Sequence, residues 1–140
     1  MFRRILVSID LSDPPLAREA IARAVAMADD DGEVRLVHVR PLMPLMMLEY
    51  VPDGFDSERQ VDAEKKLGEL ARSVQLPTER VSMVVRQGGV YPEVIAEAES
   101  WDAKVIVTGA HRPAMSTYLL GSNASAIVRH ARCSVFVVRT

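Results

Sequence analysis

The sequence predicts an α/β fold, a five-stranded parallel sheet that is doubly wound with four helices, in a single domain spanning residues 1–140. The first observation behind this prediction is that short apolar runs alternate along the chain with longer segments whose apolar residues recur at helical spacing. The second is that the short runs are continuously apolar, which is typical of strands covered on both faces. Because parallel strands need crossover connections, the alternation favours a parallel sheet with helices on its faces.

The first strand is predicted over residues 5–9, a β-branched run that ends at Asp10. Asp13 followed by Pro14-Pro15 predicts a helix start, because the carboxylate can cap free amides and proline in the first turn loses no hydrogen bond. We expect the apolar stripe of this helix to close near Asp31-Gly32.

The later elements are predicted by the same periodicities. They are expected, in order, as strand 34–39, loop 41–55, helix 56–74, strand 81–85, helix 90–98, strand 105–108, helix 122–130 and strand 135–138. The 41–55 loop is predicted from its three prolines and its lack of a clear period. Asp56 or Ser57 is expected to cap the helix that follows, with Val61 on its inward face.

Composition and charge restrict the class of function. The 140 residues are 49% hydrophobic, and 17 Lys and Arg against 19 Asp and Glu give a net charge of -2. This balance lacks the basic surface that steers proteins to phosphate chains, so we expect no nucleic-acid partner. No cluster of His, Cys, Asp and Glu has the spacing of metal ligands, so no metal site is predicted.

The chain is expected to be cytoplasmic and to have no membrane partner. Its only cysteine, Cys133, cannot form an internal disulfide, which suggests a reducing compartment. The N-terminus reaches Asp10 too soon for the apolar core of a signal peptide. No run approaches the roughly 18 apolar residues that a membrane span needs.

The segment after the fourth predicted strand is the most informative for chemistry. In sheets of this kind, ligands bind beyond the carboxyl ends of the strands at the point where the strand order reverses. Gly109 at a strand end allows a ligand close to the backbone, and Gly121 opens a helix whose free amides and dipole suit an anion. Arg112, on the loop between them, could supply forked donors to phosphate. The alternative is that both glycines only permit turns and Ser122 only caps the helix.

The whole chain resembles the universal stress protein family. The opening run Ile-Leu-Val-Ser-Ile-Asp at 5–10 and the closing helix and strand at 128–139 match the family's first and last elements. The segment from Gly109 matches its nucleotide motif, which is Gly-x-x-Gly, nine residues and Gly-Ser or Gly-Thr. Two departures are present, because Arg112 stands at the second glycine and only eight residues separate it from Gly121. The stretch from His111 through Asn123 is similar to a subgroup of small bacterial stress proteins that includes ATP binders.

This resemblance implies a Rossmann-like sheet of the adenine nucleotide alpha hydrolase-like type, with strand order 3-2-1-4-5 and ATP bound together with Mg²⁺. It places Asp10 near the adenine and ribose, the Val39 main chain on the adenine edge, and Gly109 against the ribose. The phosphates would be held by Gly121, Ser122 and Asn123, assisted by Arg112 and His111. A role for Asp10 in a turn or cap is the alternative.

Three classes of function follow. The first is an ATP-binding stress-response or signalling module. The second is a slow ATPase or an autophosphorylating enzyme, although the segment offers His111 without an evident acid to orient it. The third is a protein-interaction module without nucleotide.

A homodimer is also expected. The implied strand order leaves residues 135–138 at an edge of the sheet, and this run is apolar and carries no proline. Antiparallel pairing with the same strand of a second chain would satisfy its unpaired backbone groups. The resemblance points the same way, because members of the family commonly dimerise through this strand.

Overall fold

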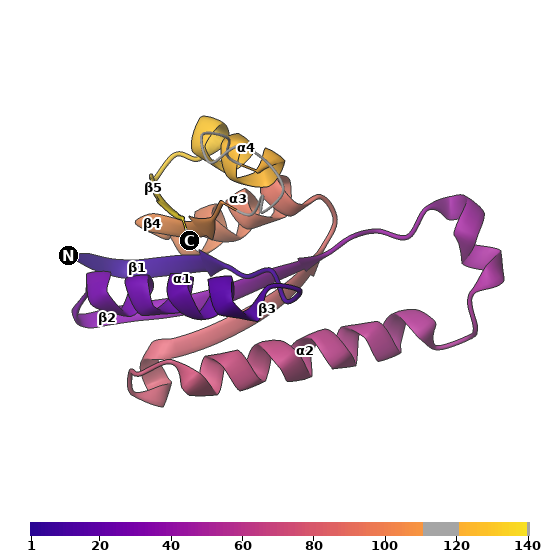
Figure 1. The fold of residues 1–140 in the computed structure, drawn as a ribbon, viewed down its shortest axis with the longest axis horizontal. Coiled ribbons are helices and arrows are strands. Elements are labelled where there is room, and N and C mark those ends of the chain that lie inside the picture. Colours follow the sequence, from indigo (N-terminus) through magenta and orange to yellow (C-terminus); the bar gives the residue numbers. More distant parts are fainter. Residues whose placement is uncertain (111–120, 140) are drawn as a thin grey trace.

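The computed structural model describes residues 1–110 and 121–139. These residues form one five-stranded parallel sheet in the order β3-β2-β1-β4-β5 with four α-helices, so the predicted fold class and strand order are confirmed (Figure 1). The elements are β1 (Phe2–Ser8), α1 (Pro14–Met27), β2 (Ala28–Arg40), α2 (Phe55–Ser73), β3 (Val81–Gln87), α3 (Val90–Trp101), β4 (Val105–Gly109), α4 (Ser122–His130) and β5 (Ser134–Val138). Two short 3-10 helices, η1 (Leu45–Tyr50) and η2 (Thr78–Arg80), precede α2 and β3.

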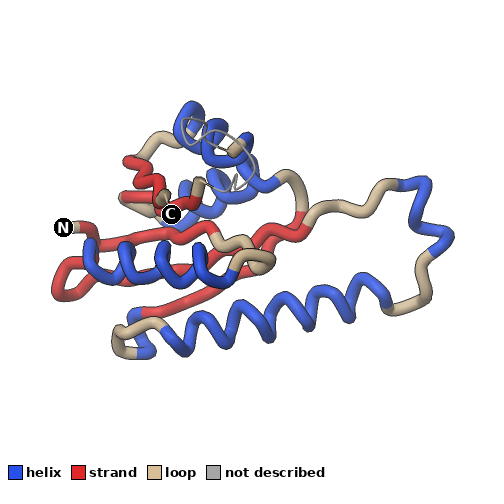
Figure 2. The backbone as a smooth tube through the Cα atoms, in the orientation of Figure 1, coloured by secondary structure: helices blue, strands red, loops and turns tan. Residues whose placement is uncertain are grey.

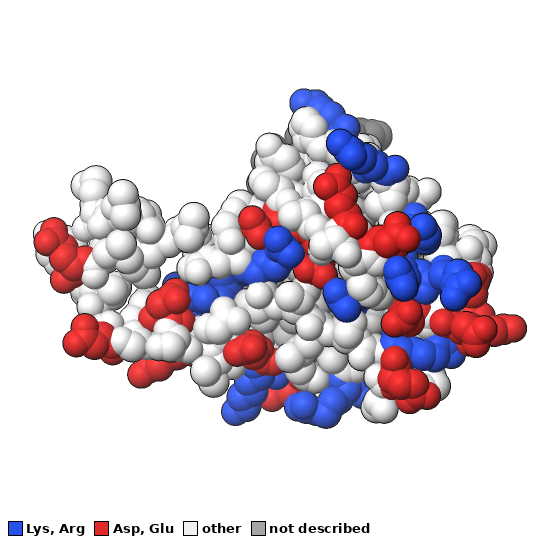
Figure 3. Space-filling model, turned by 180° about the vertical axis from the view of Figure 1, so that it is seen from behind, with Lys and Arg blue, Asp and Glu red and all other residues white. Residues whose placement is uncertain are grey.

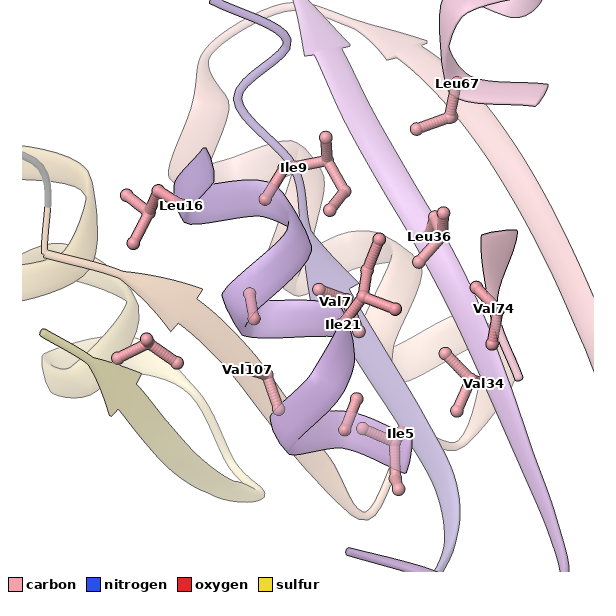
Figure 4. Packing of buried hydrophobic residues seen from close by; sticks show 14 of the residues in the cluster. Ile5, Val7, Ile9, Leu16, Ile21, Val34, Leu36, Leu67, Val74 and Val107 are labelled. Carbon is pink, nitrogen blue, oxygen red and sulfur yellow. The ribbon is translucent and has the colours of Figure 1, made fainter. Parts of the chain in front are cut away.

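The sheet is covered on both faces, which explains why its central strands are continuously apolar. Within β1, Ile5 and Val7 point to one face and Leu6 points to the other, and none of the three is exposed to solvent. The Ile5 face packs against α1 and against Leu67 of α2 (Figure 4). The Leu6 face packs against α3 and α4. Alternate residues of one strand therefore contribute to two separate apolar layers.

The boundary between α1 and β2 differs from the prediction. The helix ends at Met27, and Ala28 already pairs with Phe2 of β1. Gly32 was expected to mark the helix end, but it lies inside β2 where the register with β1 shifts. A Cβ atom at Gly32 would come within 2.8 Å of the Phe2 carbonyl oxygen and the Asp29 amide nitrogen. This glycine therefore permits a close backbone approach between the two strands.

The segment 41–54, which we call the arm, leaves the sheet after β2 and returns at α2. It projects beyond the body of the protein and has η1 at its tip (Figures 1 and 2). The predicted loop thus contains one short 3-10 helix. The predicted caps of α2 are wrong, since the capping position is Gly54, in a left-handed conformation with φ of 82°, and Asp56 lies in the first turn.

The inward position predicted for Val61 is also wrong. Val61 is 63% exposed, whereas Leu67, two turns later in α2, is fully buried. The first half of α2 runs beside the base of the arm, and only the second half reaches the apolar layer of the sheet (Figure 2). The helical period was predicted correctly but its phase was not, because Val61 lies about 200° around the helix from the buried Ala63 and therefore faces solvent. Within the described residues, no helix is long and apolar enough to cross a membrane.

Candidate functional site

A cavity of about 390 Å³ lies at the carboxyl edge of the sheet, between the ends of β1, β2 and β4 and the start of α4. In the sheet, β2 lies on one side of β1 and β4 lies on the other. The cavity at the end of β1 therefore lies where the strand order reverses. Its wall includes six residues that the sequence singled out: Asp10, Val39, Gly109, Gly121, Ser122 and Asn123. The other two, His111 and Arg112, lie outside the described residues.

Asp10 follows β1 and forms the turn that leads into α1. Its Oδ1 accepts hydrogen bonds from the Ser12 amide at 2.9 Å and from the Ser12 hydroxyl at 2.6 Å. Its carbonyl oxygen accepts from the Asp13 amide at 3.1 Å, and Asp13 caps α1 by accepting from the Leu16 amide, as predicted. Asp10 therefore has the turn role that was considered as an alternative, and it also lies in the cavity wall.

His38 fixes the backbone immediately before Asp10. The Ile9 amide donates to the Val37 carbonyl oxygen at 2.8 Å, and the Ile9 carbonyl oxygen lies 2.9 Å from Nδ1 of His38. Because a carbonyl can only accept, Nδ1 carries the hydrogen in this bond. The side chain thus extends the β1–β2 contact one residue beyond the backbone ladder, and His38 lines the cavity as well. The sequence favoured a packed or hydrogen-bonded histidine here, in agreement with this bond.

Gly109 ends β4 at the cavity wall. A Cβ atom placed there would lie 2.5 Å from Cδ2 and 2.8 Å from Cγ of Leu16. Such a contact is too short for two carbon atoms, so any side chain at this position would require the Leu16 side chain to shift. This packing role was not foreseen from the sequence, where Gly109 was interpreted through ligand approach or, alternatively, a turn.

The start of α4 closes the other side of the cavity. Its capping position is Gly121, in an extended conformation with φ of -64°, and Ser122 is the first residue of the helix. Ser122 therefore does not have the N-cap role considered as an alternative. The first turn carries no acidic residue, and the last turn carries Arg129 and His130. The positive end of the helix dipole consequently lies beside the cavity, an arrangement that favours an anion.

A second cavity, of about 530 Å³, adjoins the first and shares Asp10, His38 and Pro41 with it. Arg40 lies in its wall with a side chain only 7% exposed. Its guanidinium donates to Asp56 Oδ1 at 2.6 Å and to Gln60 Oε1 at 2.8 Å. The hydrogen bond from Arg40 lowers the pKa of the Asp56 carboxyl. Sequence reasoning did not find this contact, although a charged residue closing an apolar strand was a signal.

A parallel α/β sheet with a cavity at its switch point and a helix N-terminus in the cavity wall defines a Rossmann-like α/β protein. The chain belongs to the universal stress protein family, because the family model, described as "Universal stress protein family", matches residues 1–139. Universal stress protein G of Shigella flexneri is 36% identical over 142 residues, covering 99% of this chain and 100% of that protein. Universal stress protein A homolog 1 of Coxiella burnetii is 34% identical, covering 98% and 96%.

Solved structures show the same fold. The universal stress protein UspA from Lactobacillus plantarum superposes with a TM-score of 0.76 at 22% identity, covering 97% of each chain. A universal stress protein solved in complex with cAMP superposes with a TM-score of 0.62 at 16% identity, covering 98% of this chain and 96% of that one. The predicted family is thus confirmed, and membership places this protein among stress-response proteins.

Proposed function

We propose that this protein binds ATP, together with Mg²⁺, in the cavity at the carboxyl edge of the sheet, and that nucleotide binding adjusts its contacts with other proteins. The observation that carries the proposal is the convergence of six predicted residues, from three strand ends and one helix start, on a single cavity. A volume of about 390 Å³ lies within the range of small-molecule sites, roughly 300–1,000 Å³.

The two ends of the cavity suit the two ends of the nucleotide. Val39 belongs to β2 and offers main-chain groups to a base, while Asp10 offers a carboxylate to a ribose hydroxyl. The α4 start offers amides to phosphate oxygens at Gly121, Ser122 and Asn123. The described residues hold no group of three or more metal ligands, so Mg²⁺ would be held mainly by the phosphates, as is usual for this ion.

Catalysis is not part of the proposal. The titratable side chains in the described wall of the cavity are Asp10 and His38, and each has an oxygen or nitrogen engaged in holding the β1–α1 turn. A general base needs a lone pair within reach of the proton that it removes and a partner that orients it. The fixed geometry of these two groups favours binding and positioning over turnover.

Calorimetry and thermal unfolding with ATP, ADP, AMP, cAMP and adenosine test this function. A ligand selective for the native state at 100 times its Kd raises the free energy of unfolding by about 2.7 kcal/mol, so ATP should raise the melting temperature measurably. A Gly121→Val variant should lose phosphate-dependent affinity, because its side chain would obstruct the amides while φ of -64° remains acceptable for valine. Absence of both heat and a melting shift at millimolar ATP would refute the proposal.

Arg112 offers a separate test of the phosphate end, since the family resemblance assigns it there. Arg112→Ala should weaken ATP more than adenosine, on the order of 1–3 kcal/mol if a charge-assisted bond is lost. Equal losses for the two ligands would indicate contact with the base or an effect on the loop.

We also propose a homodimer through β5. This strand lies at the end of the strand order, and its central residue Phe136 is 40% exposed. The Val138 carbonyl oxygen accepts from Ala110 on the β4 side. Because backbone groups of successive residues point to opposite sides of a strand, those of Val137 and Val135 face the open edge.

Val137→Pro therefore removes a donor from the open edge without removing one from the β4–β5 ladder. We expect this variant to be folded and monomeric, and Val137→Ala, which keeps the amide, to remain dimeric. Sedimentation at tens of micromolar measures both. A monomeric wild type would defeat the proposed dimer.

A further inference from the structure

The arm is built as a defined projection with fixed ends. Arg40, the last residue of β2 before the arm begins, donates to Asp56 in the first turn of α2 and to Gln60 one turn later. The Arg40 carbonyl oxygen also accepts from the Gly88 amide at 2.9 Å, which holds the end of β2 to the segment after β3. The two ends of the arm are thus joined through the Arg40 side chain, its first end is also held to the sheet by a main-chain bond, and the intervening residues extend away from the body (Figure 1).

The arm carries an unusual concentration of exposed apolar side chains. Six large ones are exposed on it: Leu42, Leu45, Met46, Met47, Leu48 and Tyr50. Leu45 and Met46 are 85% and 83% exposed, and no residue of η1 is buried. Soluble proteins seldom expose contiguous apolar side chains to this extent unless another surface covers them. These side chains do not pack on the body of their own chain, so the covering surface is expected from a partner.

Charge narrows the choice of partner. The only charged residues of the arm are Glu49 and Asp53, and it contains no Lys or Arg. Figure 3 shows the arm as a white lobe edged by red side chains. An acidic rim is repelled by nucleic acid and by anionic lipid surfaces, whereas it complements a protein surface that is apolar and rimmed by basic residues.

This chain has such a surface of its own at α4 and β5. Residues 121–139 contain Arg129, Arg132 and Arg139 and no Asp or Glu. Arg129 is exposed, and the Arg132 side chain is 88% exposed, with only a 3.6 Å contact to Glu99. Val128, next to Arg129, is an apolar residue that is 48% exposed. The acidic arm and the basic C-terminal end of α4 are therefore complementary in charge, and both expose apolar groups.

The proposed β5 dimer would bring these two surfaces to the same edge. All strands of the sheet are parallel, so β5 ends at the edge from which the arm departs after β2. In an antiparallel β5 pair, the start of β5 in the second copy lies at that edge, preceded by Arg132 and the last turn of α4. The two-fold symmetry of such a dimer makes the same contact twice.

We propose that the arm docks on the C-terminal end of α4 and the following connection in a second copy of this chain, with Glu49 and Asp53 facing Arg129 and Arg132. This inference rests on the proposed β5 dimer and adds a second, reciprocal interface to it. The apolar side chains of η1 would be covered by the partner surface, and the charges would set which surface the arm selects.

A charge exchange between two variants tests the docking. One variant carries Glu49→Arg and Asp53→Arg, and the other carries Arg129→Glu and Arg132→Glu. Each homodimer then opposes like charges at both contacts, so we expect its dissociation constant to rise about tenfold or more. The mixed sample opposes unlike charges at both contacts, so heterodimers should form with an affinity near that of the wild type.

A third variant, Glu64→Arg with Glu69→Arg, is the matched control, because it reverses two exposed acids of α2 outside the arm. It should associate like the wild type. Sedimentation with one variant fluorescently labelled distinguishes homodimers from heterodimers, and circular dichroism checks folding. A wild-type monomer would overturn the β5 dimer and the docking together. Wild-type dimers whose affinity is unchanged by either charge reversal, or reversals that the mixture does not rescue, would overturn the docking alone.

Discussion

The Arg40 guanidinium donates a 2.6 Å hydrogen bond to Asp56 Oδ1, and this ion pair joins the last residue of β2 to the second residue of α2 across the base of the arm. The two partners differ in environment, because the Arg40 side chain is 7% exposed and the Asp56 side chain is 72% exposed. The Arg40 guanidinium is therefore buried at the end of β2, and the start of α2 places the Asp56 carboxylate beside it.

The ion pair should make stability depend on pH in the acid range. Arg40 lowers the pKa of Asp56 in the folded state, so the unfolded chain binds more protons there. The stabilisation is then fully present above the unfolded pKa and is lost as pH falls through the folded pKa. We expect Asp56→Asn to lower the urea midpoint relative to wild type at pH 7 and to show little difference at pH 2. Glu64→Gln, at an exposed acid of α2 outside the arm, is the control, and an equal pH dependence in both variants would contradict the assignment.

His38 should contribute to both stability and nucleotide affinity through the Ile9 carbonyl. His38→Leu leaves that carbonyl without its ring donor and should cost about 1–3 kcal/mol of unfolding free energy. Affinity for ATP should fall as well, because the adjoining Asp10 turn loses its support. His38→Asn offers an amide donor near the position of Nδ1 and should recover most of both losses. Urea unfolding and calorimetry measure the two effects, and no rescue by asparagine would show that the donor is not the cause.

Substitutions at Gly109 and Leu16 should have coupled effects on the free energy of unfolding. Gly109→Ala places a methyl group where the Leu16 side chain lies, and overpacking of this kind costs about 1–3 kcal/mol. Leu16→Ala alone opens a cavity and should cost about 2–5 kcal/mol. In the double variant the smaller side chain makes room, so the two losses should sum to more than the measured total. Strict additivity in urea unfolding would mean that the contact does not determine the need for glycine.

Glu97 should be the most sensitive charged residue of the α3 face. It is 5% exposed and accepts from Arg35 Nη1 at 2.7 Å and from Arg86 Nη1 at 2.8 Å. Glu97→Ala leaves both guanidinium groups without this carboxylate, although Arg86 keeps Glu93, and should cost about 1.5–3 kcal/mol. Glu99→Ala, half-exposed on the same helix, should cost far less. Equal costs for the two variants in denaturant unfolding would contradict a buried network.

The sequence by itself determined the alternation of strands and helices, the cap of α1 and six residues of the cavity wall. These signals are local, because an apolar run reports that both faces of a strand are covered and Asp13 caps amides within three residues of itself. That these cavity residues lie together was also predictable, since strand ends and a helix start meet at one edge of a parallel sheet.

Tertiary structure decided the features that depend on a distant partner. Ala28 joins β2 instead of α1 because Phe2 pairs with it, and Val61 is exposed because α2 packs on the body of the protein through its opposite side, which carries Ala63. Arg40 finds Asp56 only because the arm returns to its starting point. Helix propensity contributes only a few tenths of a kcal/mol per residue. Strand pairing and burial contribute more, and they depend on segments far away in the sequence.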